Sequence, residues 1–159
     1  MATMTDTPPL VVRRTLSAPL ALVYRAWSDP VLAARWSWGA EFETLSVELD
    51  CRPGGAWRQV IRHRITREQW SFDGVFREVE PLRRLVHTFH WRSDRGHEEG
   101  PSLVVVEFFE RAERTEVVIT HRKLDSAKVE GTRMGWDGVL EAVERCVVEA
   151  SGVTGPSGQ

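Results

Sequence analysis

The stretch GTRMGWDGVLEAVERCVVEA, residues 131–150, decides the fold of this chain, because it predicts one long amphipathic helix. Its apolar residues recur at helical spacing and form a single stripe of Trp136, Val139, Leu140, Val143, Cys146, Val147 and Ala150. The helix is expected over about 128–150, and Ser151-Gly152 supplies a glycine that can end it. Burial of five such side chains contributes roughly 10 kcal/mol as an upper bound. The helix therefore needs a large apolar partner surface.

Two short helices are predicted upstream, directly after a first strand over 10–16. Ser17 is expected to cap the first helix, with Pro19 in its first turn. The pair Asp29-Pro30 starts the second, since an N-cap residue is followed by proline at the first helical position.

The partner surface is predicted from residue 41 onward, where the apolar pattern changes to a period of two. Strands are expected over 41–49, 56–65, 70–79, 84–91, 103–109 and 116–121. Leu45, Val47 and Leu49 are expected to point inward from the first of these, and 93–101 is expected to be a polar loop. Short turns between consecutive strands indicate an antiparallel meander. The prediction is an α+β domain with a curved sheet around one long helix.

Composition bounds the domain organisation and the classes of partner. The chain has 159 residues, of which 42% are hydrophobic and 28% charged, which favours one domain over 10–150 with disordered tails at 1–9 and 151–159. A net charge of −2 gives no reason to expect nucleic acid or an anionic membrane as partner. No signal-peptide pattern and no apolar run of membrane-spanning length is present, so a cytoplasmic protein is expected. Cys51 and Cys146 are expected to be reduced thiols.

Four stretches, in the right order, resemble the family named after the activator of the ninety-kilodalton heat-shock protein's ATPase, within the START-like or SRPBCC superfamily. They are Ser17-Ala18-Pro19 through Val23-Tyr24-Arg25-Ala26-Trp27-Ser28-Asp29-Pro30 to Trp36; Arg52-Pro53-Gly54-Gly55-Ala56-Trp57; Gly74 to Pro81 with Arg84-Leu85-Val86 and Thr88; and Gly135-Trp136 with Leu140. The resemblance covers about residues 10–150. It implies the helix-grip fold, a curved antiparallel sheet wrapped around the long helix, with a deep groove between them.

Two positions depart from that family's pattern. His87 stands where the family commonly has an aromatic residue, and Thr132 stands where a histidine is common, just before Gly-Trp. Both positions are expected to face or flank the groove, so the ligand chemistry of this chain is expected to be its own.

The candidate site is a set of aromatic and histidine side chains that strand alternation and the helix stripe could turn inward. As a cavity lining, this set would bind an apolar or aromatic molecule and orient it with a few polar groups; plain core packing is the other interpretation. The set is Trp57, Trp70, Phe72, Phe76, His87, Phe89, Trp91, Phe108, His121 and Trp136.

Metal and catalytic motifs do not emerge from the sequence. The five histidines lack the i, i+4 spacing of a helical zinc site, and no G-x-S-x-G motif is present. No metal and no cofactor is predicted. The basic residues Arg58, Arg62, Arg64 and Arg67 are interpreted as a solvated sheet face balanced by acids.

Three functions stay open at this point. The first is a non-enzymatic domain that holds a small hydrophobic molecule in the groove, as a monomer or homodimer. The second, implied by the resemblance, is a co-chaperone-like or regulatory protein-interaction module of the stress response. The third is a cyclase- or hydrolase-like enzyme that uses the same cavity. A closed apolar cavity would favour the ligand-binding domain, and an exposed apolar patch would favour the protein-interaction module. A histidine or carboxylate in the cavity with a shifted pKa would favour the enzyme.

Overall fold

The computed structural model describes residues 8–36 and 39–152. The described chain runs strand, two short helices, six strands, a short 3-10 turn and one long helix. Its elements are β1 (Leu10–Leu16), α1 (Leu20–Ser28), α2 (Pro30–Ala33), β2 (Phe42–Leu49), β3 (Ala56–His63), β4 (Gln69–Glu80), β5 (Arg84–Ser93), β6 (Glu98–Arg111), β7 (Arg114–Arg122), η1 (Ser126–Lys128) and α3 (Val129–Ala150). The predicted order of elements and the α+β class are confirmed.

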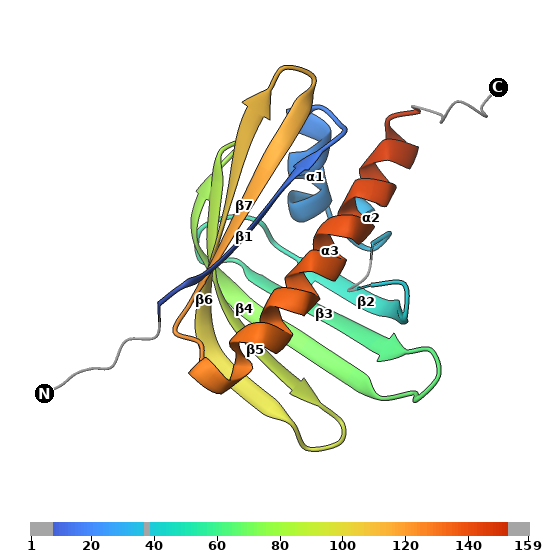
Figure 1. Cartoon of the computed structure of the whole chain (residues 1–159), viewed down its shortest axis with the longest axis vertical. Helices are drawn as coiled ribbons and strands as arrows, with labels where there is room; N and C mark the ends of the chain where they lie inside the picture. The colour runs from blue at the N-terminus through green and yellow to red at the C-terminus, as the bar shows by residue number, and fades with distance from the viewer. Residues whose placement is uncertain (1–7, 37–38, 153–159) are drawn as a thin grey trace, which may run out of the picture.

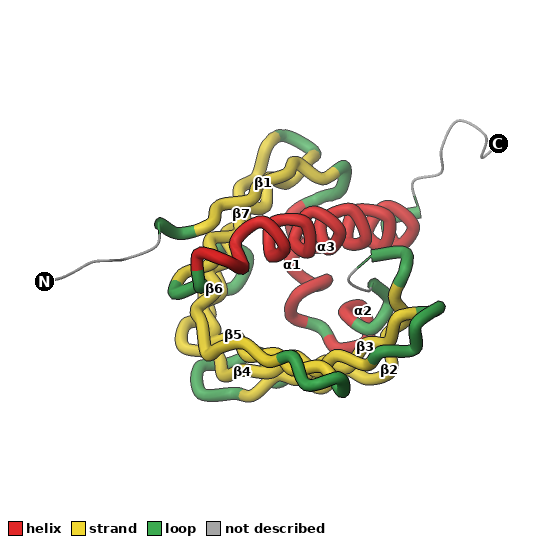
Figure 2. The backbone as a smooth tube through the Cα atoms, turned by 60° about the horizontal axis from the view of Figure 1, so that its bottom comes forward, coloured by secondary structure: helices red, strands yellow, loops and turns green. Residues whose placement is uncertain are grey.

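All seven strands form one antiparallel sheet in the order β1-β7-β6-β5-β4-β3-β2. The first strand returns to pair with the last, and the others follow in sequence as a meander. The sheet curls, and α3 runs across its open side, opposite β4 and β5 (Figures 1 and 2). This is the helix-grip architecture, in which the concave face of the sheet and one side of α3 enclose the interior.

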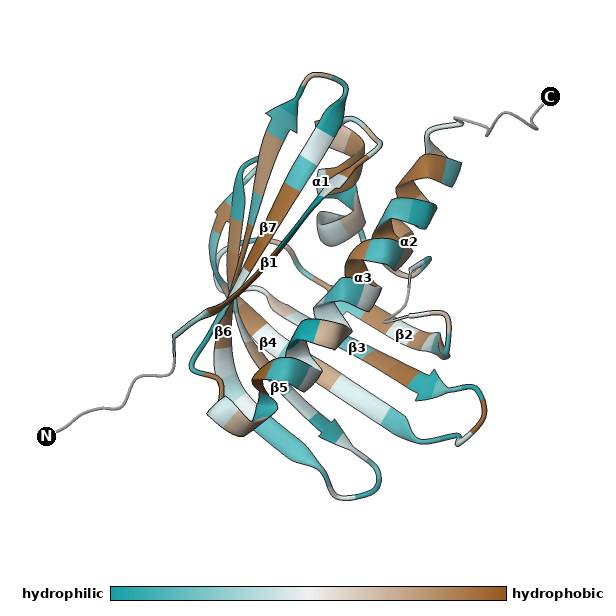
Figure 3. Ribbon diagram, in the orientation of Figure 1, coloured by the Kyte–Doolittle hydropathy of each residue, from teal (hydrophilic) through white to brown (hydrophobic). Residues whose placement is uncertain are grey.

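The long helix is buried most deeply from Trp136 onward, and in its first turn Val129 is partly buried against the core. Its buried residues begin at Trp136 and continue through Val147, and they pack with β1 and α1. None of residues 129–135 is buried. In Figure 3 the apolar colouring of α3 is accordingly strongest in its C-terminal half. The amphipathic stripe therefore holds the helix at one end, and the other end roofs a groove.

Polar contacts fix β1 and the residue that follows it to α3. Glu144 accepts hydrogen bonds from the Arg14 guanidinium at 3.0 Å and from the Ser17 backbone N–H at 3.1 Å.

The expected cap of the first short helix by Ser17 is wrong, because Pro19 is the N-cap of α1 and no side chain caps it. The second predicted start is confirmed, because the Asp29 carboxylate accepts from the Val31 N–H and Pro30 opens α2.

Three local expectations from the sequence are wrong. Leu45 does not point inward but is 40% exposed, because the β2–β3 register shifts between Thr44 and Ser46 and a bulge moves Leu45 to the outer face. Residues 98–101 belong to β6 and not to the expected loop. Ala150 is exposed at the last turn of α3, beyond the apolar contacts.

Other features of the chain agree with their expectations or lie outside the description. Gly152 has a φ of +75° and its N–H bonds to the Glu149 carbonyl, so glycine does end α3. Cys51 and Cys146 are both free thiols. Within the described residues, no helix is long and apolar enough to cross a membrane. Of the expected tails, 1–7 and 153–159 lie outside the described residues.

Candidate functional site

A groove of about 690 Å³ lies between the N-terminal half of α3 and the concave face of the sheet. Strands β2 to β7 supply its floor, and residues 127–141 supply its roof. Six aromatic rings line it: Phe42, Trp70, Phe72, Phe89, Trp91 and Trp136. This volume falls in the range of about 300–1,000 Å³ that is usual for small-molecule sites.

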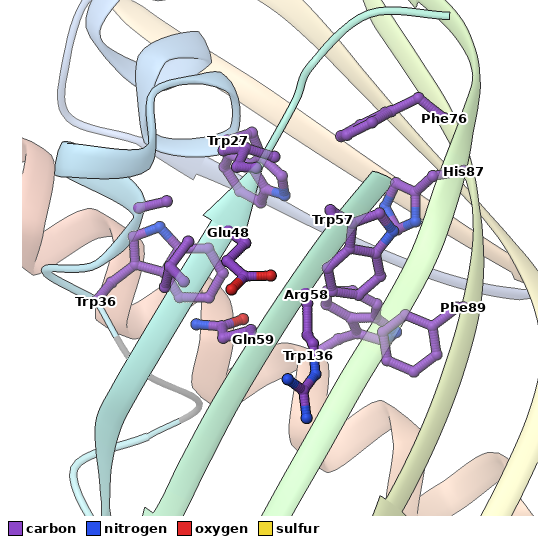
Figure 4. A pocket seen from close by; sticks show the side chains of 13 residues that line it. Trp27, Trp36, Glu48, Trp57, Arg58, Gln59, Phe76, His87, Phe89 and Trp136 are labelled. Atoms are coloured by element: carbon purple, nitrogen blue, oxygen red, sulfur yellow. The ribbon is translucent and has the colours of Figure 1, made fainter. Parts of the chain in front are cut away.

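A second, smaller hollow of about 60 Å³, the inner pocket, lies between the short helices and strands β2 to β5. Trp27 and Trp36 line one side, facing the cluster of Trp57, His87, Phe89 and Trp136 (Figure 4). The groove and the inner pocket adjoin, because Phe89 and Trp136 line both of them.

Nine of the ten predicted site residues line one hollow or both. The groove takes Trp70, Phe72, Trp91 and His121; the inner pocket takes Trp57, Phe76 and His87; Phe89 and Trp136 are shared. Phe108 lies elsewhere, in edge-to-face contact with Tyr24 and Trp27. Phe108 is buried, but its contacts are with side chains of α1, which covers that part of the concave face.

Several lining residues were not identified from the sequence. Trp27 lies in α1, and Trp36 follows the end of α2. Ser102 lies between the loop expected over 93–101 and the strand expected over 103–109, and the structure places it in β6. Gly131 and Gly135 lie on the groove side of α3, and a Cβ added at either would meet no atom within 4 Å. Their open surroundings could not be inferred from glycine alone.

His121 sits in the groove wall within a chain of hydrogen bonds. The Trp136 indole N–H donates to Nδ1 of His121 at 3.0 Å, and Nε2 lies 2.7 Å from Oγ of Ser102. Ser102 in turn donates to the Phe89 carbonyl at 3.2 Å. Because an indole nitrogen can only donate, Nδ1 of His121 is the acceptor and Nε2 carries the proton. The neutral ring therefore satisfies both of its nitrogens inside the protein.

His87 has the opposite tautomer. Its Nδ1 lies 2.9 Å from the backbone carbonyl of Thr88, which can only accept, so Nδ1 carries the proton. The Trp57 indole N–H donates to the same carbonyl at 3.2 Å. Nε2 of His87 is therefore a lone-pair acceptor in the inner pocket.

Burial keeps both rings neutral. Desolvation lowers the pKa of His87 to about 4, against the raising effect of the Thr88 carbonyl. Desolvation, with a smaller contribution from His87, lowers the pKa of His121 to about 3. A general base works best with a pKa near the working pH, so both rings are weak bases at neutral pH. The Ser102–His121 pair also lacks the geometry of a nucleophile and its base, since the proton on Nε2 blocks transfer from the serine hydroxyl.

A metal centre is not supported by the donor set. Among residues 8–36 and 39–152, no group of three or more His, Cys, Asp and Glu side chains could hold a metal ion. The charged groups that line the groove are the carboxylates of Glu41, Glu99 and Glu141 and the ammonium of Lys128. Glu99 accepts a hydrogen bond from the Trp91 indole at 3.2 Å, and the Lys128 ammonium lies 5.7 Å from the Trp91 ring centre. The hollows thus offer aromatic surface with a few isolated polar groups.

Comparison with known proteins identifies relatives across nearly the whole chain. The family model described as Activator of Hsp90 ATPase homolog 1-like protein matches residues 17–147. A crystal structure of a protein from Chromobacterium violaceum is 26% identical, with a TM-score of 0.77, and covers 88% of this chain and 96% of its own. An AHSA1-like protein from Aeromonas hydrophila, solved in solution, is 26% identical with a TM-score of 0.69 and covers 91% and 96%. No protein in the curated set matches the sequence significantly.

Proposed function

This chain belongs to the Activator of Hsp90 ATPase homolog 1-like family of START-like proteins, and we propose that it binds a small hydrophobic molecule in the groove without transforming it. The START-like fold supports ligand-binding or regulatory domains in general. The observation that carries this proposal is the groove of about 690 Å³, whose floor is aromatic and whose helical roof includes Gly131 and Gly135. Core packing alone would close such a space, because protein interiors are filled to crystal-like density.

The residues of the roof favour an open groove over a packed core. Gly131 and Gly135 sit inside a helix, where each glycine costs roughly 1 kcal/mol relative to alanine. A Cβ at either position would extend into open space. A sequence selected only for a stable helix–sheet core would place an apolar side chain there. Glycine at these positions instead keeps the groove wide.

The polar groups of the site favour binding over catalysis. His121 is engaged on both nitrogens, and His87 is kept neutral by burial. Neither has the pKa of a general base at neutral pH. The aromatic floor supplies apolar contact area, and the isolated polar groups supply orientation, which is the usual composition of a binding site for small molecules.

A dye titration with a blocking variant tests this function. Nile red, a neutral apolar dye, should bind the wild-type protein saturably, with a rise in its fluorescence and quenching of tryptophan emission. Gly135→Leu should weaken this binding at least tenfold, because the new side chain occupies the groove, and should leave the circular dichroism spectrum unchanged. Arg133→Leu, which places the same leucine side chain on an exposed position of the same helix, is the control and should bind as the wild type does.

Two results would overturn the proposal. Fluorescence that rises without saturation in the wild-type protein would show nonspecific adsorption to the surface. Equal affinities for wild type and Gly135→Leu would place the dye outside the groove.

A further inference from the structure

We infer that the bound molecule carries a hydrogen-bond donor, a hydroxyl or N–H group at one end of its apolar body, which binds to Nε2 of His87 in the inner pocket. This inference rests on the proposed function and adds the polarity and position of the ligand's polar group. It assigns to His87 the role of a specificity-determining acceptor.

The tautomer of His87 is set by backbone geometry. The pairing of β4 with β5 is interrupted between Asp73 and Phe76, and at this break the Thr88 carbonyl accepts from the side chains of His87 and Trp57. The Val75 N–H bonds instead to the Thr88 hydroxyl at 2.8 Å. Since a carbonyl has no proton to give, the bond fixes the proton of His87 on Nδ1 and leaves Nε2 as an acceptor.

Gly74 makes this arrangement possible. A Cβ at Gly74 would lie 1.9 Å from the Thr88 carbonyl oxygen and 2.5 Å from Nε1 of Trp57. Only glycine allows the carbonyl and the indole to approach β4 so closely. The Thr88 carbonyl, the Trp57 indole and the His87 ring therefore form a preformed unit, held by the strand backbone.

His87 lines the inner pocket among aromatic rings, and Glu48, Arg58 and Gln59 line the same pocket. His87 is 7% exposed, and its ring makes edge-to-face contacts with Trp57 at 5.0 Å and Phe76 at 5.6 Å. No donor to its Nε2 is found among the described residues, and the Trp57 N–H beside it is already bonded to Thr88. A ligand donor can bond to this free lone pair, whereas a ligand group that can only accept cannot.

The sizes of the two hollows define the shape of the ligand. The inner pocket, at about 60 Å³, has room for a polar tip of a few atoms, and the adjoining groove, at about 690 Å³, has room for the body. Phe89 and Trp136, whose ring centres lie 5.8 Å apart, border both spaces. The donor therefore belongs at the end of an elongated, largely aromatic or aliphatic molecule.

Matched probes and a matched variant test this assignment. The probes are 2-naphthol and 2-methylnaphthalene, which have nearly the same shape but differ in the donor. The protein is compared as wild type and as His87→Phe, which keeps an aromatic ring and removes the acceptor. The ratio of the two dissociation constants should favour 2-naphthol at least tenfold more in the wild-type protein than in the variant, because only the wild type offers Nε2.

The possible results separate this inference from the proposed function. Saturable binding of both probes with the same ratio in wild type and variant overturns the role of His87 and leaves the groove function intact. If neither probe binds saturably, both the role of His87 and the proposed groove function are overturned. If His87→Phe does not fold, nitrogen NMR of the wild type decides: on addition of 2-naphthol the His87 Nε2 resonance should move while that of His121 stays, and an unmoved His87 resonance in the saturated complex overturns the inference.

Discussion

Trp136 on α3 donates its indole N–H to Nδ1 of His121 on β7, across 3.0 Å. Trp136 is the first buried residue of α3, and it also orients a histidine in the groove wall. Trp136 is 3% exposed and His121 is 1% exposed, so the bond lies in a water-poor setting. It joins the core of the helix to the wall of the groove.

The two buried histidines should therefore show opposite tautomers. His121 is protonated on Nε2, because Trp136 occupies Nδ1, and His87 is protonated on Nδ1, because the Thr88 carbonyl accepts from it. Long-range proton–nitrogen correlation spectra at pH 7 assign the protonated nitrogen of each ring directly. A His121 ring protonated on Nδ1 would contradict the hydrogen-bond chain from Trp136 to Ser102.

Shortening Trp136 separates its packing from its hydrogen bond. Trp136→Ala should lower the free energy of unfolding by about 3–5 kcal/mol, because it empties a site in the helix–sheet core. Trp136→Phe keeps most of the ring but leaves Nδ1 of His121 without its donor, so it should cost about 1–3 kcal/mol. Urea denaturation followed by circular dichroism measures both, and a loss below about 1 kcal/mol for the alanine variant would mean that the helix register is wrong.

Two glycine-to-alanine variants should change stability in opposite directions. Gly74→Ala should be strongly destabilising, by at least about 2 kcal/mol, because its Cβ would overlap the Thr88 carbonyl oxygen. Gly131→Ala should be stabilising by about 0.5–1 kcal/mol, since a helical glycine is replaced and its Cβ meets open space. Thermal unfolding of both proteins checks this. A stable Gly74→Ala protein would show that β4 and β5 do not approach as described.

Acid should destabilise the protein through its two buried histidines. Their pKa values in the folded state, about 4 for His87 and about 3 for His121, lie below the ordinary value of 6.5. Below pH 6.5 the unfolded chain takes up protons that the folded chain does not, so the free energy of unfolding should be constant above about pH 6.5 and fall as the pH is lowered toward 4. The loss attributable to His87 alone is on the order of 3 kcal/mol.

The interval between pH 6.5 and 4.5 isolates this effect. The carboxyls of Asp29, Glu43 and Glu68 have pKa values lowered by hydrogen bonds. Their ordinary pKa values are 3.8 to 4.5, so the stability that they contribute is lost mainly below about pH 4.5. In His87→Phe the dependence of stability on pH over that interval should fall to roughly one half. Urea titrations at several pH values measure it, and a wild-type stability that stays flat down to pH 4.5 would show that the rings are accessible to water.

Much of the fold could be predicted because its signals are local and periodic. The stripe from Trp136 to Val147 indicated a single buried helix, and alternation indicated the strands that face it. Leu45 was misplaced because a bulge shifts the alternation by one residue, and nothing in the alternating pattern itself marks a bulge. The strand start at Glu98 was missed because its first residues are polar and carry no period.

The site was predictable in its residue types and not in its connections. Aromatic side chains on inward positions could be listed, as Trp57, Phe89 and Trp136 show. The tautomer of His87 depends on the backbone carbonyl of Thr88, and the tautomer of His121 depends on Trp136 from α3. Spacing along the chain reveals neither partner. The open space beside Gly131 and Gly135 follows from how α3 docks at its other end, which is a property of the assembled fold.

The most direct test of the groove as a binding site is a set of intermolecular nuclear Overhauser effects in the complex with 2-naphthol. We expect contacts from the naphthalene protons to ring protons of Phe89, Trp91 and Trp136, with saturation at one molecule per chain. Contacts confined to exposed side chains such as Ile65 and Val31, which are 84% and 74% exposed, or no saturation, would contradict the groove as the binding site.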